Sequence, residues 1–163
     1  MEVSFSAKMQ AERVIRQYAD MIFRIALQNL KNKADAEDIL QDVSLALLTK
    51  NAPLYDESHI KSWLIRVTLN KCKNFHKSAH RTKTEPLSDY VELCAKEDQR
   101  LLEDVMGLPK NYRNTLYLFY YEGYSIDEIA KLLNKKPSTV GSWLHRARKK
   151  LKTIILDGGN GCE

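Results

Sequence analysis

The sequence predicts an all-α protein of two small helical domains joined by an acidic linker, with a helix-turn-helix in the second domain. Apolar residues recur every three or four positions nearly throughout, which is the period of a half-buried helix. Only 6 glycines and 4 prolines occur among 163 residues, which argues against a turn-rich sheet. The length suits one domain or two small ones, and a composition of 44% apolar and 29% charged residues is typical of globular chains.

The first predicted domain spans residues 8–82 and contains three helices. The second of them begins near Asp35, a good N-cap residue, and the third runs from about Ser58 to His80. The second half of the third helix is mostly polar and basic, which is typical of a working surface. The buried stripes expected on the three helices are, in order, Ile15, Tyr18, Ile22, Ile25 and Leu30; Ile39, Val43, Ala46 and Leu47; and Ile60, Trp63, Leu64 and Val67.

Residues 83–97 form the predicted linker, residues 98–156 the second domain and residues 157–163 a disordered tail. In the second domain, a helix starts at Pro109 and ends at Gly123, as the preferences of these residues for helix starts and ends predict. Ser125 and Glu128 have the spacing of a capping box for a short helix that ends near Leu133. The last helix is expected to have Ser138 or Thr139 as its N-cap and the buried stripe Val140, Leu144, Ala147 and Leu151.

The net charge of +5 is unevenly distributed. Residues 61–83 and 131–152 each contain many lysines and arginines and no acid, whereas residues 84–104 are predominantly acidic. A basic block alone is usually a solvated helix face. Two acid-free blocks separated by an acidic segment favour a polyanion bound at two places.

Several function classes are disfavoured by the sequence. It contains no membrane-length apolar run and no secretory signal, so the protein is expected in the cytoplasm. Cys72, Cys94 and Cys162 are an odd number of distant cysteines, which excludes a disulfide framework. Catalytic triads, paired buried carboxylates and phosphate-binding glycine loops are missing, so neither an enzyme nor a cofactor is predicted.

A helix-turn-helix is the sharpest feature of the second domain. Ala130 is the small residue at the helix crossing, Asn134 tolerates the left-handed turn, and Val140 seats the second helix. The outer face of that second helix can enter a DNA major groove, and Lys135, Lys136, Arg148 and Lys150 beside it suit phosphates. The alternative is an ordinary pair of antiparallel helices.

Segments of both domains resemble sigma factors. Leu108–Arg113, Glu122–Ala130 and Ser138–Arg148 are similar to region 4, Ala34–Val43 is similar to region 2.2, and Ser62–Asn70 is similar to the helix that leads into region 2.4. The motifs occur in the family's order and spacing. The resemblance is to the extracytoplasmic-function (ECF) group of sigma-70-type initiation factors, which retain only regions 2 and 4.

This resemblance implies a factor that binds bacterial core RNA polymerase through the helix at residues 35–48 and through the C-terminal domain, and that directs it to promoter DNA. It implies that the acidic linker threads the polymerase channel, and it leaves open whether an anti-sigma factor binds. The free protein is expected to be a monomer. The residues implied for binding core polymerase are Asp35, Glu37, Asp38, Gln41 and Asp42. Those implied for binding the melted −10 element are Asn70, Lys71, Lys73, Asn74 and Lys77. Those implied for binding the −35 duplex are Ser138, Thr139, Gly141, Ser142, His145, Arg146 and Lys149.

The chain departs from the family pattern at a few positions. Ser44 replaces a usual aromatic residue, and Gly141 and Trp143 replace two cations of the recognition helix. A glycine inside a helix costs about 1 kcal/mol relative to alanine, which indicates a close approach of the Gly141 backbone to DNA or to another helix.

Two other functions are open at this point. One is a stand-alone, dimeric helix-turn-helix regulator, which predicts tight operator binding without polymerase. The other is a metal-responsive helical adaptor, because Cys72, His76 and His80 lie four residues apart along one helix face. No fourth ligand is evident, so no metal site is predicted.

Overall fold

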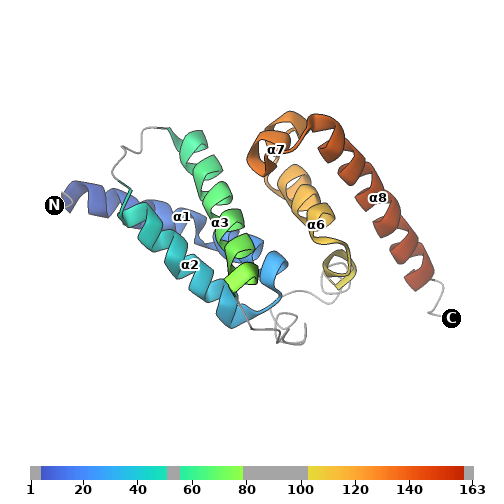
Figure 1. Cartoon of the computed structure of the whole chain (residues 1–163), viewed down its shortest axis with the longest axis horizontal. Coiled ribbons are helices and arrows are strands. Elements are labelled where there is room, and N and C mark those ends of the chain that lie inside the picture. The colour runs from blue at the N-terminus through green and yellow to red at the C-terminus, as the bar shows by residue number, and fades with distance from the viewer. Residues whose placement is uncertain (1–4, 51–55, 79–102, 160–163) are drawn as a thin grey trace. The chain divides into compact units, whose positions relative to one another are not determined.

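The computed structural model describes residues 5–50, 56–78 and 103–159. The chain forms two compact units, Met1–Glu85 and Pro86–Glu163. All the regular elements in the described ranges are helical (Figure 1). The predicted linker, His80, Cys94, Cys162 and the end of the tail lie outside these ranges.

The first unit is built from α1 (Phe5–Leu30), α2 (Lys33–Leu48) and α3 (Glu57–Ser78), each of which packs against the other two. The predicted stripes form its core, since most of their members are buried and the rest are half-buried. The half-buried members are Ile15, Ala46, Trp63 and Val67. On α3 the fully buried set also includes Ile65, Thr68 and Cys72, so this helix buries residues into its basic half.

The start of α2 differs from the prediction. The N-cap is Asn32, not Asp35, because the Asn32 side chain accepts a hydrogen bond from the backbone N–H of Asp35 at 2.9 Å. Asp35 therefore lies in the first turn, where its charge is favourable for the helix dipole. Asp56 acts similarly before α3, since its carboxylate accepts a hydrogen bond from the Ser58 backbone at 3.1 Å.

The second unit contains helical residues 103–106, α6 (Lys110–Leu116), the π-helix η1 (Tyr117–Tyr121), α7 (Ile126–Leu133) and α8 (Pro137–Gly159). Its core includes Leu108, Leu116, Leu144 and Ala147. Buried Arg113 donates hydrogen bonds from Nη1 to the carbonyls of Met106, at 3.3 Å, and Leu108, at 2.5 Å. Burial lowers the pKa of this guanidinium from its ordinary value.

The predicted helix-turn-helix is confirmed by α7 and α8. The Ser125 hydroxyl accepts a hydrogen bond from the Glu128 backbone, and the Glu128 carboxylate accepts one from the Ser125 backbone, which is the expected capping box. Asn134 adopts the left-handed conformation with φ 54°, and Ala130 and Val140 are buried. Gly123, with φ 74°, makes the expected turn after the preceding helix.

Two predictions about α8 are wrong. The helix begins at Pro137, so Ser138 and Thr139 lie in its first turn and neither is the N-cap. Proline suits this first position because it has no N–H to leave unpaired. The helix also continues to Gly159, so residues 157–159 of the expected disordered tail are helical.

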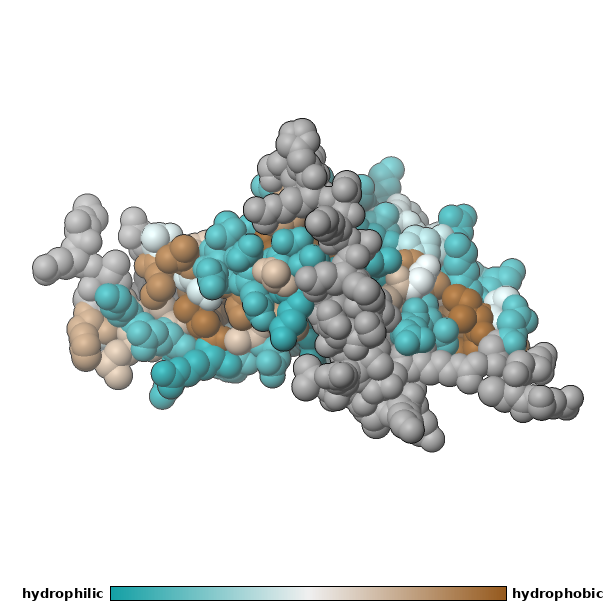
Figure 2. Space-filling model, turned by 90° about the horizontal axis from the view of Figure 1, so that it is seen from below, coloured by the Kyte–Doolittle hydropathy of each residue, from teal (hydrophilic) through white to brown (hydrophobic). Residues whose placement is uncertain are grey.

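Exposed apolar side chains interrupt the largely hydrophilic surface in the space-filling view (Figure 2). Among the described residues, the exposed large hydrophobic side chains are Phe5, Met9, Leu45, Tyr120, Tyr121, Ile155 and Leu156. Within the described ranges, the helices lack a stretch long and apolar enough to cross a membrane.

Candidate protein and nucleic-acid interfaces

The outer side of α2 carries an acidic face. Glu37, Asp38, Gln41 and Asp42 are exposed, and Asp35 is half-buried. The side of the helix that faces the core consists of buried Ala36, Ile39, Val43 and Leu47. The structure therefore brings the five predicted polymerase-binding residues onto one side of a helix whose other side is fixed in the core.

An exposed leucine belongs to the same face and was missed by the sequence analysis. Leu45 is 59% exposed, four residues after Gln41 and three after Asp42, so the three side chains are neighbours on the helix surface. Single exposed apolar residues are common on protein surfaces, and here Leu45 adds apolar contact area to an otherwise polar face. The helical period places Leu45 on this face, but the sequence alone does not show whether another part of the chain covers it.

The polar side of α3 contains most of the predicted −10 residues. Asn70, Lys73 and Asn74 are exposed and Lys71 is half-buried, whereas the Lys77 side chain lies outside the described set. Exposed Arg66 precedes Asn70 by one turn and adds a cation to this face.

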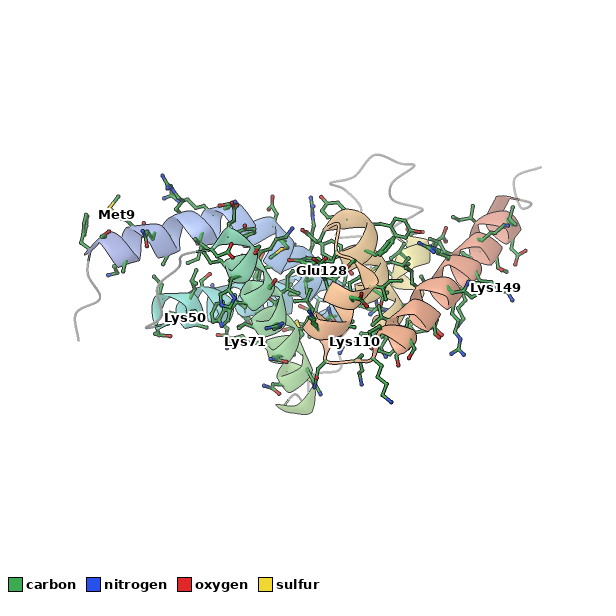
Figure 3. The ribbon with its side chains drawn as sticks, turned by 90° about the horizontal axis from the view of Figure 1, so that it is seen from above. Met9, Lys50, Lys71, Lys110, Glu128 and Lys149 are labelled. Atoms are coloured by element: carbon green, nitrogen blue, oxygen red, sulfur yellow. The ribbon has the colours of Figure 1, made fainter. Side chains whose placement is uncertain are left out.

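The amine of Lys50 extends the cationic character of this region from the end of α2. Its Nζ lies 4.7 Å from the ring centre of Trp63, within the range of a cation–π interaction. Trp63 is two turns before Asn70 and is half-buried, so the expectation that it is mainly a core residue holds only in part. Figure 3 labels Lys50 and Lys71 in this unit.

Cys72 does not share the exposed face of α3. It is fully buried beneath the helix, and the side chains of His76 and His80 lie outside the described set. Among the described residues, no group of three or more histidine, cysteine, aspartate or glutamate side chains could hold a metal ion.

The outer side of α8 carries the predicted recognition face. Ser138, Ser142, His145, Arg146 and Lys149 are exposed, and Thr139 and Gly141 are half-buried. The opposite side is closed by the buried residues Val140, Leu144 and Ala147. Lys149 projects outward from α8 in Figure 3, away from the helices that α8 packs against.

Gly141 is not crowded by a neighbouring helix. A Cβ atom built there has no heavy atom within 4 Å other than its own local backbone. Of the two expected neighbours of the Gly141 backbone, another helix does not approach it within the described residues, and DNA is the one that remains.

Two family models match this chain, and together they cover most of its length. Residues 14–82 match Sigma-70 region 2, and residues 98–151 match Sigma-70, region 4. The chain is 30% identical over 157 residues to the ECF RNA polymerase sigma factor SigE of Mycolicibacterium smegmatis, covering 88% of this chain and 61% of SigE. It is 26% identical over 162 residues to the ECF RNA polymerase sigma factor SigM of Bacillus subtilis, covering 93% of this chain and 99% of SigM.

This chain belongs to the ECF group of the sigma-70 family. It is an alternative sigma factor, a class of DNA-binding proteins that act with RNA polymerase in transcription initiation.

Two solved structures share the fold. CnrH in complex with the cytosolic domain of CnrY gives a TM-score of 0.65 at 20% identity, over 91% of this chain and 88% of that chain. The sigma factor RpoE in complex with the anti-sigma factor NepR from Bartonella quintana gives a TM-score of 0.64 at 18% identity. This match covers 91% of this chain and 95% of that chain.

The positions at which this sigma factor departs from the family pattern lie in different local environments. Ser44 is half-buried on α2 and its hydroxyl donates a hydrogen bond to the Leu40 carbonyl at 2.7 Å. Trp143 is half-buried on α8, next to the buried core residue Leu144.

Proposed function

We propose that this sigma factor binds core RNA polymerase through the outer face of α2, melted −10 DNA through the outer face of α3, and the −35 duplex through the outer face of α8. The observation that carries the proposal is the two-sided construction of each helix. One side is fixed by fully buried residues, and the other presents polar side chains in a fixed orientation.

The α2 face fits a protein partner that is basic and partly apolar. Asp38 and Asp42 supply negative charge, Gln41 supplies a neutral donor and acceptor, and exposed Leu45 supplies contact area. By the family resemblance this partner is the clamp coiled coil of the largest polymerase subunit. Complementary charge favours rapid and specific encounter, while exposed Leu45 contributes to affinity once the partner covers it.

The α3 face fits single-stranded DNA. Asn70 and Asn74 are one turn apart and can hydrogen-bond the edges of unpaired bases. Arg66, Lys71 and Lys73 place cations beside them for the sugar-phosphate backbone.

The α8 face fits duplex DNA in the major groove. Arg146 and Lys149 supply two cations on the exposed side, and Ser142 and His145 supply short polar groups for base edges. Few base contacts are available to one short recognition helix, so the free protein is expected to bind promoters weakly and with a steep salt dependence.

Further elements of the proposal follow from the family. The protein acts as a non-catalytic initiation factor where polymerase works, in the cytoplasm, and is a monomer when free. An anti-sigma factor is a further partner of the proposal, in keeping with the anti-sigma factor NepR bound to RpoE in one of the structures that share its fold.

Run-off transcription tests the proposal. Sheared genomic DNA is transcribed by bacterial core polymerase with and without the protein, and protein-dependent transcripts are expected. Gln41→Ala combined with Asp42→Ala should abolish them.

The matched control is Gln10→Ala combined with Glu12→Ala, which removes one amide and one carboxylate from exposed positions of α1. This variant should transcribe like the parent. Tight operator binding by the free protein, without transcripts and without core binding, would replace the proposal with a stand-alone regulator.

A further inference from the structure

Two cations border the recognition face of α8, and both lie over aromatic rings of the preceding helices. Arg148 and Lys150 are two residues apart, which places them about 200° apart around the helix axis, one at each edge of the face. The Arg148 guanidinium carbon is 5.3 Å from the ring centres of both Phe119 and Tyr120. The Lys150 amine is 5.6 Å from the ring centre of Tyr112. All three distances are within cation–π range.

Arg148 is held more specifically than a surface arginine usually is. Its Nε donates a hydrogen bond to the Tyr120 hydroxyl, in addition to the two ring contacts. The side chain is nevertheless exposed, and Tyr120 is 60% exposed. The guanidinium is therefore fixed in orientation without being removed from solvent.

The π-helix η1 supplies this arrangement. The N–H of Glu122 bonds to the Tyr117 carbonyl at 3.1 Å, the five-residue spacing of a π-turn. Phe119 and Tyr120 are adjacent in sequence, yet their rings meet edge to face, with centres 5.0 Å apart. One guanidinium thus contacts both rings. Single π-turns inside helices occur frequently at functional sites.

We propose that Tyr120 is a positioning residue that holds Arg148 ready to bind a DNA phosphate at the edge of the α8 interface. The guanidinium has five N–H groups, and the hydrogen bond to Tyr120 uses only the one on Nε. The two terminal nitrogens keep the fork of donors that matches a phosphate. Holding the side chain before binding removes part of the entropy cost of immobilising it on DNA.

This inference rests on the proposed function, because it assumes that α8 meets duplex DNA. It adds that the contact at this edge is sequence-independent and depends on a residue outside the helix-turn-helix. The phosphate contact itself belongs to Arg148, and Tyr120 acts only through it.

The test measures binding of the full-length protein to short duplex DNA of random sequence over a range of salt concentrations, since phosphate contacts do not depend on sequence. Arg148→Ala should lower the slope of log affinity against log salt by about 0.9, the value for one phosphate. Tyr120→Phe keeps the ring and removes the hydroxyl, and should weaken binding by about twofold to tenfold. In the Arg148→Ala background, Tyr120→Phe should have no further effect.

Two controls separate positioning from folding. Tyr121→Phe removes a hydroxyl from the equally exposed neighbour and should leave DNA binding unchanged. Combining Tyr120→Phe with Lys150→Ala should give additive losses, since Lys150 binds at the other edge. Thermal unfolding is recorded for every variant.

The outcomes are distinguishable. If Arg148→Ala lowers the unfolding midpoint but leaves the salt slope unchanged, the contacts of Arg148 with Phe119 and Tyr120 serve packing only and the inference is overturned. An equal effect of Tyr120→Phe with and without Arg148 also overturns it. If the parent protein shows no salt-dependent duplex binding at all, the proposed function of α8 fails together with the inference.

Discussion

The helices α2 and α8 are anchored in the same way, by a stripe of buried residues, but their exposed faces carry opposite charges. Each buries a stripe at helical spacing, with Ile39 and Val43 in α2 and Val140 and Ala147 in α8 all at most 1% exposed. Beyond the stripe, α2 presents carboxylates around an exposed leucine, whereas α8 presents cations and short polar side chains. The buried side sets the orientation of each face, and the outer residues determine whether the partner is a protein or a nucleic acid.

Removing the buried side of either helix should have the largest effect. Ile39→Ala and Leu144→Ala each delete a fully or nearly fully buried side chain, which typically costs about 2–5 kcal/mol. Denaturant unfolding of the full-length protein measures the loss. If either variant lowers the free energy of unfolding by less than about 1 kcal/mol, the exposed face of that helix is not held in place by the core.

Reversing the charge of the α8 face should have the next largest effect. Arg146→Glu combined with Lys149→Glu should weaken duplex binding by at least about a hundredfold, since each contact contributes about 1–3 kcal/mol and is replaced by repulsion. Core polymerase binding should be unchanged. Lys8→Glu combined with Arg13→Glu makes the same change in net charge on exposed positions of α1. An equal loss of DNA binding by that control would mean that net charge, and not the α8 face, carries the interaction.

Removing the apolar side chain from the acidic face should have a smaller effect. Leu45→Ala is expected to weaken core polymerase binding by about tenfold, the cost of losing a modest hot-spot residue, with stability changed by less than about 0.5 kcal/mol. Competition for core polymerase against the labelled parent protein measures it. Met9→Ala is the matched control, since Met9 is 57% exposed on α1 of the same unit. If both variants bind like the parent, the α2 face acts through its polar groups alone.

The smallest expected effect is a gain in stability. Gly141→Ala adds a methyl group into open space inside a helix and should stabilise the protein by about 0.8–1 kcal/mol. If the glycine permits close approach to DNA, the same substitution should weaken duplex binding. Destabilisation in the free protein would contradict the open environment seen at this position.

Local chemistry allowed much of this fold to be predicted from the sequence. The bounds of α7 follow from a capping box and an asparagine that tolerates positive φ, both of which act within a few residues. The start of α2 differs from the prediction because Asn32 and Asp35 are both good capping residues, and only the chain path selects between them.

The features that the sequence does not reveal are a local change of helix type and contacts between helices. A π-turn differs from an α-turn by one residue, so the apolar period of α6 and η1 does not reveal it. The contacts of Arg148 with Phe119 and Tyr120 join residues far apart in sequence. The outer residues of α2, α3 and α8 could be predicted from periodicity, whereas the exposure of Leu45 required the tertiary structure.

The central claim is that the α2 and α8 faces serve different partners, and parallel binding measurements on two variants test it most directly. Core polymerase affinity and duplex DNA affinity are measured for Gln41→Ala plus Asp42→Ala and for Arg146→Glu plus Lys149→Glu. We expect the first variant to lose polymerase binding and keep salt-dependent DNA binding, and the second to keep polymerase binding and lose DNA binding. Loss of both activities in each variant, with the fold intact, would contradict it.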